Sequence, residues 1–202
     1  MKYLILNFCL LLLFSANISA MELKAKQISL DLTISQPSVK LSNGLLHLTI
    51  PVEKLINAII LTSNNDPVVI LDREKQISFS VNTAGKDLLL EGFKNNQSMI
   101  SNKIADIPGI IFGLQEQVIN TSADKEFAKV ISNITEVMLS PDEHSHAYYL
   151  TKKNKTVFFL INKPQNFAFI VSENQKDYFT TIISNNINKE EFINLIVKGA
   201  LQ

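Results

Sequence analysis

The sequence has little of three residue types on which many functions depend. Its one cysteine is Cys9, it has no tryptophan, and Arg73 is its only arginine. A single cysteine allows neither an internal disulfide nor a cysteine-based zinc site. Arginine is the preferred residue for bidentate contacts with phosphates and base edges, so its scarcity argues against nucleic acid as a partner.

Residues 1–20 have the order of a secretory signal peptide. Lys2 comes first, residues 4–14 are almost wholly apolar, and the small residues Ser15, Ala16, Ser19 and Ala20 precede Met21. A membrane-spanning helix needs about 20 apolar residues, which this run does not supply. We therefore predict a periplasmic or secreted protein that touches the membrane only through a transient signal peptide. A retained signal anchor is the alternative.

Removal of residues 1–20 also removes Cys9, so the predicted mature chain has no thiol for catalysis. About 180 residues remain, enough for one domain or two small ones. The full chain has 19 basic and 19 acidic residues, and no basic run is dense enough for a membrane-surface patch. We divide the mature chain into a β-rich part, 21–95, and an α+β part, 96–202. A single continuous domain, 21–202, is the alternative.

The β-rich part is predicted from alternating apolar and polar residues, which indicate half-buried strands. Asn43 and Gly44 lie between two such runs and predict a tight hairpin, because both residues tolerate positive φ. Residues 52–60 fit either a helix or a strand. The predicted strands cover residues 28–35, 39–41, 46–50, 68–71, 77–81 and 87–93.

The second part mixes helices and strands. Thr121 or Ser122 is expected to cap a helix at 123–138, and Asn188 to begin a last helix with Glu191 in a capping box. Gly199 is expected to stop that last helix. Further helices are predicted at 98–105, ended by Pro108 and Gly109, at 110–119 and at 177–184. Aromatic-rich strands are predicted at 147–150, 156–161 and 167–171.

These elements predict an α+β fold. We expect a twisted antiparallel β-sheet of hairpins or a meander, packed with a few helices and followed by a C-terminal helical segment, in one domain or two small subdomains. At the level of fold alone, residues 147–184 with the final helix resemble the α/β/α sandwich of Mog1/PsbP-like proteins. That resemblance implies no functional residues.

The best candidate for chemistry is the segment from Pro141 to His146. His144 and His146 are two apart, so an extended chain would turn both imidazoles to one side, where they could hold a divalent metal. Asp142 or Glu143 could add an oxygen ligand or orient an imidazole. Because His47 is far away in the sequence, the segment offers only two nitrogen ligands. A solvated polar loop is the favoured interpretation.

Other catalytic signatures are missing from the sequence. It contains no Gly-x-Ser-x-Gly nucleophile motif, and Gly109 and Gly113 have glycine spacing without the lysine of a phosphate loop. The apolar run 110–114 fits a buried core segment better than a groove wall facing a partner or lipid.

The leading functional hypothesis follows from the export signal and these absences. We predict an exported, non-catalytic binding or accessory protein of the bacterial envelope or secretome. Its expected partner is another envelope or extracellular protein, and it needs no cofactor. One alternative is a divalent-metal-binding protein or enzyme using Asp142, His144 and His146. Another is a carrier of an apolar ligand between the sheet and the helices.

Overall fold

The computed structural model describes residues 23–29, 37–42, 47–63, 66–71, 74–83, 101–115 and 120–201. The predicted α+β class is confirmed: a large, mostly antiparallel sheet is joined by a two-stranded sheet and a C-terminal helix. The large sheet has the order β1 (Lys26–Gln27), β7 (His146–Lys152), β8 (Lys155–Ile161), β9 (Gln165–Ser172), β10 (Gln175–Asn185), β6 (Gln76–Thr83), β5 (Asp66–Ile70) and β4 (Ile59–Ser63).

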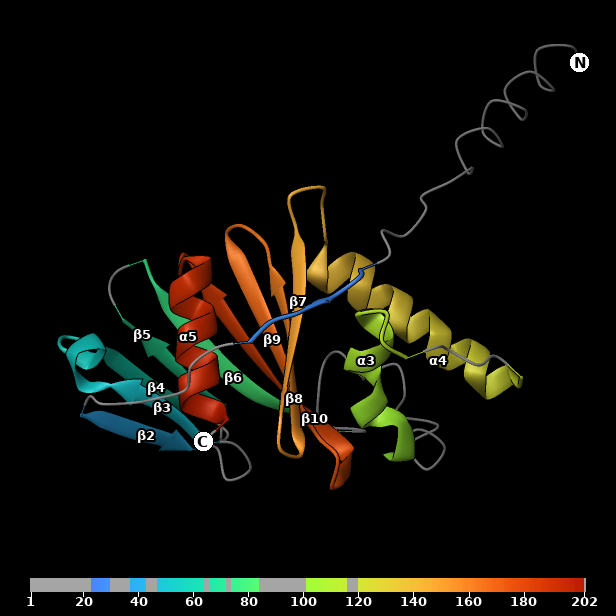
Figure 1. Cartoon of the computed structure of the whole chain (residues 1–202), viewed down its shortest axis with the longest axis horizontal. Helices are drawn as coiled ribbons and strands as arrows, with labels where there is room; N and C mark the ends of the chain where they lie inside the picture. Colours follow the sequence, from blue (N-terminus) through green and yellow to red (C-terminus); the bar gives the residue numbers. More distant parts are fainter. Residues whose placement is uncertain are drawn as a thin grey trace, which may run out of the picture.

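Strands β7 to β10 form a continuous antiparallel meander at the centre of the molecule (Figure 1). The predicted aromatic pairing between strands is confirmed, since Tyr149 lies opposite Phe158 and Phe158 lies opposite Phe169. Among the described strands, β1 alone runs parallel to its neighbour, β7. The predicted hairpin of the small sheet is also found, as β2 (Ser38–Ser42) paired with β3 (His47–Pro51).

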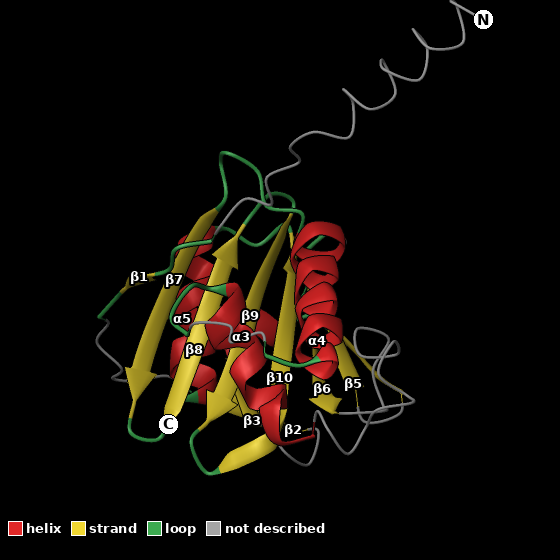
Figure 2. Ribbon diagram, turned by 90° about the vertical axis from the view of Figure 1, so that its right-hand side faces the viewer, coloured by secondary structure: helices red, strands yellow, loops and turns green. Residues whose placement is uncertain are grey.

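The large sheet is covered on both faces, which produces two apolar cores. Val157 and Phe159 of β8 belong to one core, and the alternating Phe158 and Leu160 belong to the other. The first core includes α5 (Lys189–Ala200) and β3. The second includes η3 (Ser101–Asp106), α3 (Ile107–Ile111) and α4 (Ser122–Asn133). Figure 2 shows α3 and α4 on the near side of the strands and α5 behind them.

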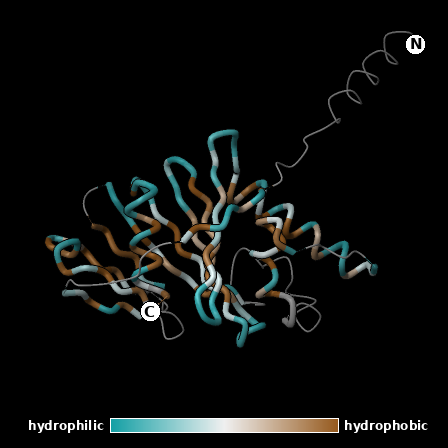
Figure 3. The backbone as a smooth tube through the Cα atoms, in the orientation of Figure 1, coloured by the Kyte–Doolittle hydropathy of each residue, from teal (hydrophilic) through white to brown (hydrophobic). Residues whose placement is uncertain are grey.

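Polar residues gather at the hairpin tips, and apolar residues follow the strands through the middle of the sheet (Figure 3). Strands buried on both faces read as continuous apolar runs. This accounts for the unbroken run of residues 157–160, all of which are buried.

The predicted helix at 123–138 is confirmed, with its cap at Thr121. The Thr121 side chain accepts a hydrogen bond from the Asp124 backbone N–H, and the Asp124 carboxylate accepts one from the Thr121 backbone N–H, in a complete capping box. The helix continues into a π-helical turn, η4 (Ile134–Leu139), that ends at Ser140 in the left-handed conformation.

The predicted helix at 177–184 is wrong, because these residues belong to β10. Residues 180–183 are Thr-Thr-Ile-Ile, and β-branched side chains favour strands. The strand lies between β9 and β6, with Ile182 opposite Phe79. Pairing on both sides outweighs the weak helical pattern.

Three predicted boundaries in the helices also differ. Pro108 lies in the first turn of α3 rather than ending a helix, because the first turn does not require its missing N–H. The helix predicted at 110–119 is replaced by α3, which ends at Ile111. Gly199 does not stop α5 but allows close approach: a Cβ there would lie 2.8 Å from the Thr49 carbonyl oxygen.

Several predicted features lie outside the described residues: the signal peptide at 1–20, most of the strand at 28–35, the Asn43-Gly44 turn and the strand at 87–93. The proposed division at residue 95 also falls there. Strands from either side of it share the large sheet, since Asn82 of β6 lies opposite Phe179 of β10.

Candidate functional site

The segment before β7 folds into a compact turn around Asp142. Its Oδ1 accepts hydrogen bonds of 2.9 Å from the Ser145 hydroxyl and from the backbone N–H of His144. The Ser145 hydroxyl in turn accepts from the backbone N–H of Asp142 at 2.9 Å. The hydrogen bond from Ser145 is the largest cause that lowers the pKa of Asp142 below its usual 3.8. Asp142 therefore has a structural role in the turn.

The two histidines beside this turn extend into solvent. His144 is 84% exposed, and its Nε2 lies 3.6 Å from a carboxylate oxygen of Glu143, which is 86% exposed. His146 begins β7, where its ring centroid lies 6.5 Å from that of Tyr148. Within the described ranges, no group of three or more His, Cys, Asp or Glu side chains could hold a metal ion. A metal site at Asp142, His144 and His146 stays a prediction.

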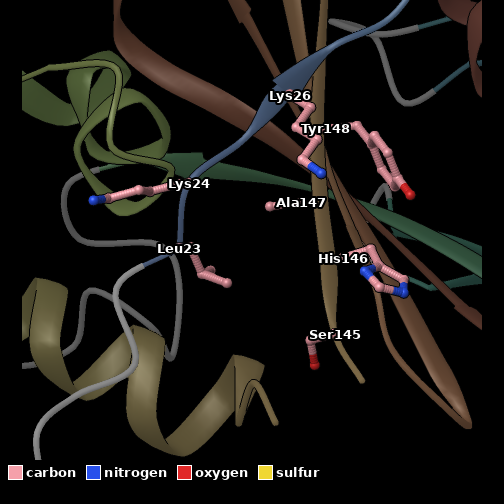
Figure 4. A pocket seen from close by; sticks show the side chains of 7 residues that line it. All are labelled: Leu23, Lys24, Lys26, Ser145, His146, Ala147 and Tyr148. Carbon is pink, nitrogen blue, oxygen red and sulfur yellow. The ribbon is translucent and has the colours of Figure 1, made fainter. Parts of the chain in front are cut away.

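A shallow pocket of about 170 Å³ lies beside this segment, between β1 and the start of β7 (Figure 4). It is lined by Leu23, Lys24, Lys26, Ser145, His146, Ala147 and Tyr148. Lys26 lies opposite Tyr148 in the strand pairing. Nζ of Lys189 donates a hydrogen bond of 2.6 Å to the phenolic oxygen of Tyr148 and lies 4.2 Å from the centroid of the same ring. Two lysines make the pocket basic, and it is open to solvent.

The apolar run 110–114 is core only in its middle. Ile111 and Phe112 are buried, as predicted, whereas Ile110 is half-buried and Leu114 is 44% exposed. Gly113 has φ +71°, and a Cβ there would lie 2.8 Å from the Leu23 carbonyl oxygen. The backbone N–H of Ala25 donates to the Phe112 carbonyl at 3.2 Å. This run therefore anchors the segment that carries β1.

Most of the large apolar side chains that are exposed gather at the other end of the sheet. Ile59, Ile60 and Leu61 are 56%, 42% and 51% exposed, and they form most of β4, the last strand of the large sheet. Two more exposed residues precede β4. Val52, 43% exposed, lies in η1 (Val52–Leu55), and Ile56, 66% exposed, directly follows η1. We call these five residues the apolar edge. Figure 3 shows hydrophobic chain at this end of the molecule.

Sequence reasoning did not find the apolar edge. The signal was present, because residues 55–63 contain no charged side chain and are mostly apolar. The same pattern fits a strand buried in the middle of a sheet. Only the strand order shows that β4 has a neighbour on one side alone among the described residues.

No family model, curated protein or solved structure matches this chain. The resemblance to the Mog1/PsbP-like sandwich therefore stays a prediction. Among the described residues, no helix combines the length and the apolar character needed to cross a membrane.

Proposed function

We propose that this chain is an exported, non-catalytic binding or accessory protein of the bacterial envelope or secretome that acts through protein–protein contacts. The observation that carries the proposal is the apolar edge. Soluble proteins usually protect an edge strand with charged residues, proline or a covering element, because its free N–H and C=O groups can pair with another chain. Within β4 itself, there is neither a charged residue nor a proline.

The opposite edge of the sheet supports the proposal by contrast. There, β1 has two residues, both exposed, and one of them is Lys26. A short strand with a lysine is a protected edge. Among the described strands, one edge of the sheet is therefore protected and the other has no strand beyond it, as expected of an edge that receives a strand from another chain.

The test is affinity capture from an envelope extract of the producing cells, with bound proteins identified by mass spectrometry. Three forms of the chain are compared: unchanged, Ile59→Lys, and Val137→Lys as the matched control. Val137 is 77% exposed and lies in η4, a helical turn that is not part of the sheet. We expect a specific partner with the unchanged chain and the control, and at least about tenfold less with Ile59→Lys. A partner captured equally by all three forms, or no partner at all, contradicts the proposal.

A further inference from the structure

The ladder between β5 and β6 shows which backbone groups of β4 face away from the sheet. The backbone N–H of Leu71 donates to the Lys75 carbonyl at 2.9 Å, on the side of β5 that faces β6. Hydrogen-bonded and non-hydrogen-bonded pairs alternate in an antiparallel ladder. Val69, two residues earlier, therefore also bonds towards β6, and its partner in β4, Ile60, directs its own N–H and C=O outward.

Thr62 has the same outward orientation. It lies opposite Pro67, which faces β6 like Val69, so the missing N–H of the proline costs the pairing with β4 nothing. Leu61 lies between these two residues and bonds inward to Val68. Ile60 and Thr62 thus present two donors and two acceptors at the outer edge, and no described strand pairs with them.

We infer that the apolar edge pairs with β4 of a second copy of this chain, antiparallel and about a two-fold axis at Leu61. This inference rests on the proposed function, since it uses the same surface and names one occupant. In this register each Leu61 faces its copy, and Ile60 of either chain exchanges two hydrogen bonds with Thr62 of the other. The backbone N–H of Ala58 is already bonded to the Leu55 carbonyl at 3.0 Å, so a register that needs Ala58 is disfavoured.

Charge favours a second copy over a different chain. A two-fold axis pairs β4 with an identical strand, so like charges close to the axis would face each other. Residues 55–63 carry no charge, and the pairing about Leu61 brings only apolar, Thr and Ser side chains together.

The first test is disulfide formation, in the full chain carrying Cys9→Ser so that an introduced cysteine is the only one. Facing residues of a non-hydrogen-bonded antiparallel pair have Cα atoms about 4.5 Å apart, which a disulfide can span. We expect Leu61→Cys to form a disulfide dimer at least about tenfold faster than Ile59→Cys or the control Val137→Cys. Equal rates in all three variants overturn the inference.

The second test is a charge exchange followed by sedimentation velocity. We expect the unchanged chain to be dimeric, and Leu61→Lys and Leu61→Glu each to dimerise at least about tenfold more weakly, because like charges then face each other. Mixing these two variants is expected to restore a dimer. Circular dichroism checks that both variants are folded. Val137→Lys is the control and is expected to remain a dimer.

The outcomes separate this inference from the proposed function. A monomeric unchanged chain at about 100 µM, or a dimer that Leu61→Lys leaves intact, overturns pairing through β4. Capture of another envelope protein by the apolar edge would still support the proposed function in that case. A β4-paired dimer that captures no other protein supports the inference and contradicts binding to a separate partner.

Discussion

Glu191 in α5 accepts a hydrogen bond of 2.5 Å from Nζ of Lys54, which lies 137 residues earlier in η1. Nζ of Lys75 lies 3.5 Å from the second carboxylate oxygen. Partial burial raises the pKa of Glu191. The hydrogen bonds and positive charges of the two lysines lower it by more than burial raises it, so the pKa lies below its usual 4.5. Because only residues 56–58 separate η1 from β4, this ion pair holds the start of the apolar edge against α5.

Replacing Glu191 with glutamine should make stability less dependent on pH. The folded pKa of Glu191 is lowered, so its contribution is present above about pH 4.5 and is lost as the pH falls through the folded pKa. We expect Glu191→Gln to lower the free energy of unfolding by about 1 kcal/mol or less at pH 7, since the lysines are more than a third exposed and screened. The difference should shrink below pH 4.5 in urea denaturation.

Glu190→Gln is the matched control for that measurement. Glu190 also lies in the first turn of α5, so both variants lose the same favourable interaction with the helix dipole. A loss of stability as large in Glu190→Gln as in Glu191→Gln would show that the ion pair adds nothing.

Gly199→Ala should loosen the contact between α5 and β3. The added Cβ would lie 2.8 Å from both Leu48 Cδ1 and the Thr49 carbonyl oxygen, and the latter is backbone that cannot easily move. We expect a loss of about 1–3 kcal/mol in the free energy of unfolding, despite the better helix propensity of alanine. Gly109→Ala is the control, because its Cβ would meet the flexible Gln115 side chain. Equal effects in the two variants would refute the close-contact explanation.

Thr121→Ala should weaken the start of α4. It removes the side-chain oxygen that accepts from the Asp124 N–H, and the loss of such a cap costs about 1 kcal/mol. Thermal unfolding of Thr121→Ala and of the neighbouring Ser122→Ala measures this. The capping assignment fails if Ser122→Ala is the more damaging change.

The histidine pair gives a prediction about metal. Both imidazoles are exposed, and Oδ1 of Asp142 already accepts two hydrogen bonds, so we expect purified, dialysed protein to hold much less than one equivalent of divalent metal. Metal analysis by mass spectrometry, with His144→Ala/His146→Ala as comparison, checks this. About one equivalent that disappears in the double variant would instead support the metal-binding alternative.

Local signals in the sequence predicted much of the fold. The hairpins, the aromatic strands and the caps at Thr121 and Asn188 each depend on residues close together in the chain, and the structure contains them. The Glu191 half of the second capping box differs, because its carboxylate binds the distant Lys54. The strand β10 was missed because its pairing with β6 joins residues about a hundred positions apart.

For the candidate site, the sequence by itself determined which residue types are available. It sets the two histidines beside Asp142, the single cysteine and the uncharged run at 55–63. The tertiary structure alone decided which of these are free to act. It engaged Asp142 in a turn and placed the uncharged run at the last strand of the sheet. Strand order depends on long-range pairing and packing of both faces, which no local pattern encodes.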